Sequence, residues 1–210
     1  MNAQRSRSRN GRSPKILVFG ESKNDVDSIR ELLVAANASL QGQMKPMLTP
    51  PSLTAQAGRT AVGGWVKQIA GAVEGVKATG EQVRAVVVHR DADCYDANGS
   101  EHQRLTVQLA AVAGHPVVPV QMIEAWWFLF PDAVEAIRPG AWRNTMPRRA
   151  VDVERINAPK VELMRLTRRS GKEYAEADSV AIAQEIRSQS ATPLGVSASY
   201  DRLQRLALQI

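Results

Sequence analysis

The chain has 210 residues, 44% of them hydrophobic, and carries 27 lysines and arginines against 21 aspartates and glutamates, a formal net charge of +6. This length predicts a single α/β domain with a helical extension and argues against two independent domains. The longest apolar stretch, residues 115–130, falls short of a bilayer span of roughly 20 residues and contains Gln121 and Glu124, so we expect no membrane partner.

Cysteine content and charge distribution narrow the possible classes further. Cys94 is the only cysteine, which excludes an internal disulfide and a cysteine zinc cluster and favours a cytoplasmic protein. Residues 1–14 carry four arginines among polar residues and predict a disordered basic arm. Residues 138–172 hold ten lysines and arginines against three acidic residues. An acidic centre between basic segments is typical of a metal site surrounded by phosphate contacts; solvated helix faces with a solubility arm are the alternative.

Apolar runs rich in valine and isoleucine alternate with helical patterns in residues 15–137. They predict strands at 15–20 and 83–89, a third strand that opens at His115 and Pro116, and a possible short strand at 44–48. Helices are expected at 25–36, at 62–76, from 98–100 onward and at 123–130. The expected helix caps are Asn24 or Asp25 for the first of these helices and a capping box of Ser100 with Gln103 for the third. The alternation predicts a mostly parallel central sheet flanked by helices.

The last part of the chain, residues 138–210, is predicted to be a basic helical extension packed on that domain. After an irregular stretch at 139–147, helices are expected at 159–167, 179–188 and 199–208. In the apolar helix expected at 123–130, Trp126 and Phe130 share a stripe and belong to the core. Trp127 points away from that stripe, and stacking on a nucleic-acid base is the alternative to a structural role.

Acidic residues follow each of the three long predicted strands. Glu21 follows the first strand, Asp91 and Asp93 follow the second, and Glu124 follows the third. Because the loops after parallel strands gather at one edge of the sheet, we expect these carboxylates to meet in space. If the extended conformation persists past His89, Asp91 and Asp93 project to the same side. Converging carboxylates repel one another unless a hard divalent cation binds them, which predicts Mg²⁺ or Mn²⁺.

The segment Glu21-Ser-Lys-Asn-Asp25 followed later by Asp91-Ala-Asp93 resembles the TOPRIM domain of topoisomerases, DnaG-type primases and overcoming-lysogenisation-defect nucleases. The TOPRIM likeness covers roughly residues 15–130. A closer resemblance is to a family of small bacterial TOPRIM-like proteins of uncharacterised function, carried by Ile123-Glu124-Ala-Trp126, Lys160, Tyr174 and Ser199-Tyr-Asp-Arg-Leu203. The glycine that commonly follows the family glutamate is Ser22 here. A serine puts a close approach of backbone to phosphate in doubt.

The resemblance implies roles for the acidic residues. Glu21 corresponds to a general acid or base, and Asp91 and Asp93 correspond to the aspartates that hold magnesium. Asp25 and Glu124 would be further metal ligands or would position the ligands. His89 could move protons, although a structural role is favoured. The candidate phosphate contacts are Lys23, Arg90, Arg148, Arg149, Arg165, Arg168, Arg169 and Lys172.

These features together predict a magnesium-dependent nuclease, and the TOPRIM resemblance implies a place in a phage or mobile-element defence system beside a partner ATPase. Any such ATPase must be another chain, because no GxxxxGK[ST] phosphate loop occurs here. A non-catalytic TOPRIM-like module that binds nucleic acid or protein is the second possibility. A nucleotide-handling enzyme on a flavodoxin-like sheet is the third possibility. The loop 20–24 argues against this enzyme, because an acidic loop is poorly suited to bind cofactor phosphates.

Overall fold

A computed structural model describes residues 14–47, 62–93, 98–169 and 171–210. The first 13 residues of the predicted arm and Cys94 lie outside these ranges. Among the described helices, none combines the length and the apolar composition that a bilayer crossing requires.

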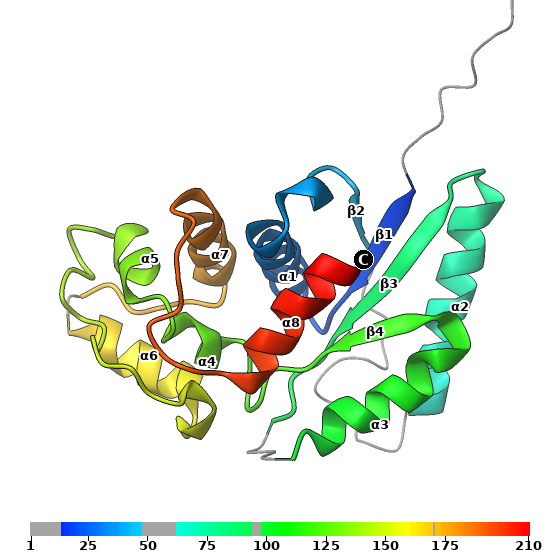
Figure 1. Cartoon of the computed structure of the whole chain (residues 1–210). Coiled ribbons are helices and arrows are strands. Elements are labelled where there is room, and N and C mark those ends of the chain that lie inside the picture. Colours follow the sequence, from blue (N-terminus) through cyan, green and yellow to red (C-terminus); the bar gives the residue numbers. More distant parts are fainter. Residues whose placement is uncertain (1–13, 48–61, 94–97, 170) are drawn as a thin grey trace, which may run out of the picture.

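A four-stranded parallel sheet forms the centre of the molecule and confirms the predicted α/β class (Figure 1). Its strands are β1 (Lys15–Phe19), β2 (Met44–Pro46), β3 (Val83–His89) and β4 (Gly114–Val117). Their order across the sheet is β2-β1-β3-β4. The short strand expected at 44–48 is therefore present, and the third long strand ends earlier than its apolar run.

Residues alternate between the two faces of the sheet, as the period of an extended chain requires. Ile16 and Val18 of β1 pack in the same cluster as α1 (Lys23–Ala36) and α8 (Ala198–Gln209). Leu17 and Phe19 belong to the opposite cluster, with α2 (Val62–Ala78) and α3 (Ser100–Leu109). Both faces are thus covered by helices, which is why the strands read as continuous apolar runs.

The C-terminal elements continue the first of these two clusters. They are α4 (Glu124–Trp127), α5 (Pro131–Ala136), α6 (Pro159–Arg168) and α7 (Asp178–Ser188), of which α7 lies along α1 (Figure 1). The predicted helices at 159–167, 179–188 and 199–208 are confirmed within one residue at each end. One hydrophobic cluster includes side chains from β1 through α8, so the extension has no separate core.

Two local predictions are wrong, and one alternative is excluded. The single helix expected at 123–130 is a four-residue helix, and Pro131 begins α5 instead of only ending its predecessor, since proline suits the first turn of a helix. Trp127 is fully buried, so it is not available for base stacking. Gly99, not Ser100, is the N-cap of α3, with a φ of 64° and no side-chain cap bond, so the predicted capping box with Gln103 does not form.

The strand order places a change of direction between β1 and β3. The chain moves from β1 outward to β2 on one side and then returns to add β3 and β4 on the other side. In open parallel sheets, ligands bind outside the carboxyl ends of the strands at such a point. Glu21 and Asp91 each follow one of these two strands, so the fold itself places them at the position where a site is expected.

Candidate metal site at the carboxyl edge of the sheet

One cavity of about 260 Å³ receives all five carboxylates that the sequence singles out: Glu21, Asp25, Asp91, Asp93 and Glu124. They come from the ends of β1 and β3, the first turn of α1 and the start of α4. Ser22, Met122, Lys160 and Glu176 complete the lining. The expectation that acids far apart in sequence meet at one edge of the sheet therefore holds at the level of the cavity.

The turn between β1 and α1 is fixed by a capping box. The Ser22 side chain accepts a hydrogen bond from the Asp25 amide at 3.1 Å, and the Asp25 carboxylate accepts one from the Ser22 amide at 3.0 Å. Ser22 is therefore the N-cap, where Asn24 or Asp25 was expected. The residue that departs from the glycine of the TOPRIM pattern thus has a structural use, and Asp25 has one oxygen committed to the backbone.

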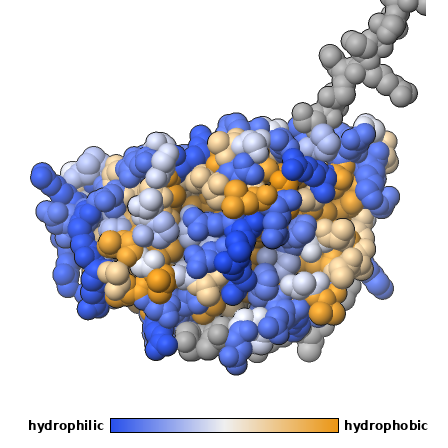
Figure 2. Space-filling view, in the orientation of Figure 1, coloured by the Kyte–Doolittle hydropathy of each residue, from blue (hydrophilic) through white to orange (hydrophobic). Residues whose placement is uncertain are grey.

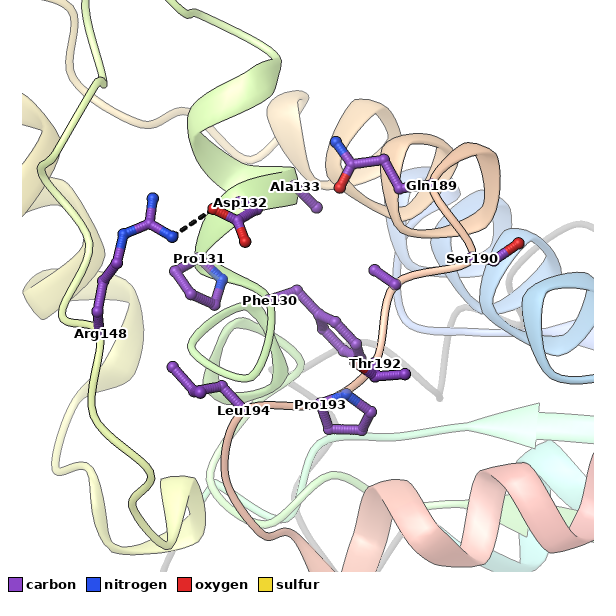
Figure 3. A pocket seen from close by; sticks show the side chains of 11 residues that line it. Phe130, Pro131, Asp132, Ala133, Arg148, Gln189, Ser190, Thr192, Pro193 and Leu194 are labelled. Carbon is purple, nitrogen blue, oxygen red and sulfur yellow. Dashed lines mark hydrogen bonds and ion pairs between the residues drawn. The ribbon is translucent and has the colours of Figure 1, made fainter.

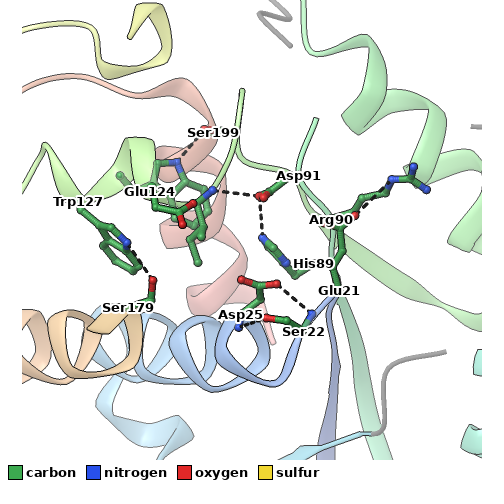
Figure 4. A network of polar contacts seen from close by, with 12 residues as sticks. Glu21, Ser22, Asp25, His89, Arg90, Asp91, Glu124, Trp127, Ser179 and Ser199 are labelled. Atoms are coloured by element: carbon green, nitrogen blue, oxygen red, sulfur yellow. Dashed lines mark hydrogen bonds and ion pairs between the residues drawn. The ribbon is translucent and has the colours of Figure 1, made fainter. Parts of the chain in front are cut away.

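Asp91 is anchored on two sides (Figure 4). Its Oδ1 lies 3.2 Å from His89 Nε2 and accepts a hydrogen bond of 3.0 Å from the Ile123 amide. The extended conformation does not persist to Asp93, whose φ is 56°, although the Asp93 amide still donates to the Gln121 carbonyl at 2.8 Å. Asp93 is exposed where Asp91 is not. The pair therefore shares the cavity without the same-side alternation of a strand.

Burial and mutual repulsion make the cavity carboxylates weak acids. Burial, reinforced by Asp91, raises the pKa of Glu21 to about 8. Burial and Asp91 likewise raise the pKa of Glu124 to about 7, and burial raises the pKa of Asp91. Burial opposes protonation of His89, but the contact with Asp91 outweighs it and raises the pKa of His89 to about 9. The His89–Asp91 pair consequently holds a proton above neutral pH.

Glu124 joins the cavity to a buried polar network in the C-terminal part of the chain. Tyr174 Oη donates to Glu124 Oε1 at 3.3 Å and lies 2.5 Å from Ser179 Oγ, which accepts a bond of 3.3 Å from Trp127 Nε1. Figure 4 shows Trp127 and Ser179 facing each other between α4 and α7. This network explains why Trp127 is buried, because its indole N–H has a partner inside the protein.

The cavity offers oxygen donors of the kind that bind a divalent cation. Glu21 Oε1 is buried with no hydrogen-bond donor, although Arg90 Nε lies 3.7 Å away as an ion-pair partner. A surplus of carboxylate oxygens with raised pKa values is the donor set that a hard cation would neutralise. Within the described residues, however, no three Asp, Glu, His or Cys side chains converge closely enough to hold one ion. The donor chemistry fits Mg²⁺ or Mn²⁺, and binding would require these side chains to close in.

Sequence reasoning gave no role in the site to two residues of the C-terminal extension. Lys160, at the start of α6, lines the cavity and pairs with Glu176 at 3.2 Å. Burial lowers the pKa of Lys160, but Glu124 and Glu176 outweigh it and keep the pKa raised. Among the described residues that line the cavity, Lys160 is the only cation. The TOPRIM-like resemblance included Lys160 and was the one available signal.

The predicted phosphate contacts divide into three groups. Lys23 is 89% exposed and pairs with Asp27, whereas Arg90 is buried and turned toward Glu21. Arg148 and Arg165 are paired with carboxylates. The described structure gives no ion pair to the remaining exposed candidates: Arg149, Arg168, Arg169 and Lys172. Arg90 therefore contacts the site from inside the protein, and Arg148 and Arg165 have their charge largely compensated.

A larger cavity of about 440 Å³ lies between the start of α5 and the loop that precedes α8 (Figure 3). Arg148 faces Asp132 across it, and Glu135 accepts a second bond from Arg148 at 2.7 Å. Its other lining includes Phe130, Pro131 and Pro193. Neither a titratable cluster nor an uncompensated charge gathers there, so we place the candidate site in the smaller acidic cavity.

Comparison with known proteins adds no relative to these observations. No family model matches the chain, and neither a curated protein nor a solved structure does. The TOPRIM resemblance therefore stays a prediction, whereas the parallel α/β fold is shown by the strands themselves.

Proposed function

We propose that the protein is a metal-dependent phosphodiester hydrolase that cleaves nucleic acid. The observation that carries the proposal is the cavity shared by five carboxylates from three strand-end segments and by Glu176, with Lys160 as the one cation among the described residues of its lining. Glu21, Asp91 and Asp93 would hold Mg²⁺ or Mn²⁺, with Asp25 and Glu124 beside them. A divalent ion bound there supplies a Lewis acid and lowers the pKa of bound water.

The residues of the chain have distinct tasks in this reaction. A water oxygen attacks phosphorus, the bond to the leaving oxygen breaks, and the proton of the water passes to a base. Glu21 is the candidate base because it lines the cavity and its buried Oε1 has no hydrogen-bond donor, so that oxygen is left to accept the proton. Lys160, beside Glu124 and Glu176, would contact a non-bridging phosphate oxygen. His89 holds Asp91 in position and does not reach the substrate, since its side chain is fully buried.

A cleavage assay on plasmid, single-stranded DNA and RNA, with Mg²⁺ or Mn²⁺ and with EDTA, tests the proposal. Asp91→Asn and Asp93→Asn should each lower metal-dependent cleavage by at least about 100-fold, the scale of losing one group that stabilises the transition state. Glu74→Gln removes one carboxylate from α2, where its side chain is 70% exposed, and should leave the rate unchanged. Full cleavage by both Asn variants would refute the assignment.

A non-catalytic module is the second candidate, favoured by Ser22 in the place of the glycine of the TOPRIM pattern, because a serine hinders a close approach of backbone to phosphate. Such a protein would bind the ion and a nucleic acid or protein partner without turnover. Calorimetric Mg²⁺ titration should show ion binding for either function. The cleavage assay then distinguishes them, because only the hydrolase cleaves nucleic acid. A role in phage or mobile-element defence with a partner ATPase belongs to the proposal as well, and purification of the chain with its neighbours would test it.

A further inference from the structure

A third cavity, of about 250 Å³, is lined by residues of α3, β4 and α8, which lie at the β4 edge of the sheet in Figure 1. His102 and Thr106 of α3, His115 of β4, and Arg202 and Arg205 of α8 line it, together with Gly114, Pro116, Leu206 and Gln209. None of the described residues in this lining carries a carboxylate. The cavity therefore has the opposite charge character to the acidic one.

The two arginines of this cavity differ from the ion-paired arginines in the C-terminal part of the chain. Arg138, Arg148 and Arg165 each pair with a carboxylate. In the described ranges, neither Arg202 nor Arg205 forms an ion pair, and Figure 2 shows strongly hydrophilic atoms beside hydrophobic ones where α8 lies. Two guanidinium groups at one cavity with no ion-pair partner give it a positive charge that a bound anion would stabilise.

Unsatisfied polar atoms support the same interpretation. Arg202 Nε and His102 Nδ1 are buried atoms with no hydrogen-bond partner. Buried donors of this kind usually have a partner, and an orphan at a pocket points to a missing one. Burial lowers the pKa of His102, and the charge of Arg202 lowers it further, so the imidazole senses the surplus positive charge.

The Arg202 guanidinium also reaches the start of α3. A Cβ added to Gly99, the N-cap of that helix, would lie 3.7 Å from Arg202 Nη1. The positive end of a helix dipole and a guanidinium thus lie side by side, and an anion would stabilise both. Gly99 has a φ of 64°, which suits glycine and leaves room for the arginine.

We propose that this cavity, lined by His102, His115, Arg202 and Arg205, is a phosphate-binding pocket. A guanidinium offers a planar fork of donors that matches two phosphate oxygens, and a neutral imidazole adds one N–H. The phosphate is either a free phosphate ion or the backbone phosphate of a polynucleotide. The pocket is proposed on its own residues and does not depend on the acidic cavity.

Calorimetric titration with inorganic phosphate in EDTA at low salt tests the pocket. The double variant Arg202→Gln/Arg205→Gln should weaken phosphate binding at least tenfold, since each lost bidentate contact weakens affinity substantially. Lys67→Gln/Arg143→Gln removes the same charge from exposed positions outside the pocket, which form no ion pair among the described residues, and should change the affinity less than twofold. Equal weakening in both variants, or no phosphate binding by the unaltered protein, overturns the proposal.

A second titration identifies the source of the phosphate. The ligand is a polynucleotide backbone if an oligothymidylate binds and inorganic phosphate displaces it. In the pocket variant, the slope of its log affinity against log salt concentration should then be smaller by about two. The pocket binds free phosphate if the oligonucleotide binds the unaltered protein and the pocket variant with equal affinity, while inorganic phosphate binds the pocket variant more weakly. Arg205→Glu, at an exposed position, keeps the test available should the Arg202 change impair folding. Asp91→Asn should retain phosphate binding, so a failed acidic site and a failed pocket give different results.

Discussion

His89 Nε2 lies 3.2 Å from Asp91 Oδ1 at the end of β3, and the same oxygen accepts the Ile123 amide that precedes α4. The histidine side chain is fully buried and only 14% of the aspartate side chain is exposed. This contact joins the last residue of β3 to the first acid after the strand and, through Ile123, to the start of α4. Asp91 is therefore held in place before any ligand binds, with its second carboxylate oxygen left for the cavity.

A double-mutant cycle measures that relationship. His89→Leu leaves Asp91 mostly buried without its partner and should lower the free energy of unfolding by about 2–3 kcal/mol, less than a fully buried pair would lose. Asp91→Asn keeps an acceptor for the Ile123 amide. The free energy of unfolding lost in the double variant should be smaller than the sum of the two single-variant losses by at least about 1 kcal/mol. Urea unfolding at pH 7 in EDTA gives the four values. Additive losses would show that the contact carries no energy.

The raised pKa of Glu21 predicts a pH dependence of stability in the metal-free protein. Because its pKa is about 8 in the folded state against an ordinary 4.5, the folded protein binds the proton more tightly. Glu21 therefore lowers the free energy of unfolding as the pH rises from about 4.5 to about 8. Glu21→Gln should equal the unaltered protein near pH 4.5 and exceed it above pH 8, by on the order of 2 kcal/mol.

Urea unfolding across that pH range in EDTA checks this prediction. Glu74→Gln is the matched control, since the same change at a 70% exposed side chain should not alter the profile. Parallel profiles for Glu21→Gln and the unaltered protein would mean that Glu21 ionises as an ordinary surface glutamate.

Substitutions of Ser22 test whether its side chain stabilises the start of α1, at the position where the TOPRIM pattern has glycine. Ser22→Ala should lower the free energy of unfolding by about 1 kcal/mol, because the Asp25 amide loses its acceptor, whereas Ser22→Gly should cost only a few tenths. Thermal unfolding monitored by circular dichroism compares the two variants. A glycine variant as unstable as the alanine variant would contradict the capping role of Ser22.

Sequence alone was sufficient to place the acids at one edge of the sheet. Apolar runs mark the strands, parallel strands share a carboxyl edge, and Glu21 and Asp91 follow two such runs. Those rules use only the local pattern and a topology that is nearly obligatory. The confirmed helices of the last third follow in the same way from caps and apolar spacing.

The features of the site that the sequence could not predict depend on tertiary packing. Lys160 and Glu176 reach the cavity because α6 and the segment after it pack against α4, and no local pattern encodes that contact. Trp127 seemed to leave the apolar stripe of a helix, yet the helix is a single turn and Ser179, far along the chain, provides its hydrogen-bond partner. Asp93 leaves the strand direction because its backbone turns at a φ of 56°.

Gly195 is the position where a single methyl group should disturb the start of α8. A Cβ built there would lie 2.3 Å from the Val151 carbonyl oxygen, which already accepts the Val196 amide at 3.0 Å. The next residues hold α8 in place, since Ser197 caps the helix and Ser199 accepts the Trp126 indole at 3.0 Å. The added methyl group must therefore push two backbone segments apart.

Gly195→Ala should lower the free energy of unfolding by about 3 kcal/mol, at the upper end of the usual cost of overpacking because a backbone carbonyl cannot rotate away. Gly140→Ala is the matched control: nothing lies within 4 Å of its Cβ, so the change should stay within about 0.5 kcal/mol. Urea unfolding compares the two variants, and Trp126 fluorescence should change in the first because its partner Ser199 moves with the helix start. Equal stability of the two variants would mean that residues 151 and 195 are not in contact.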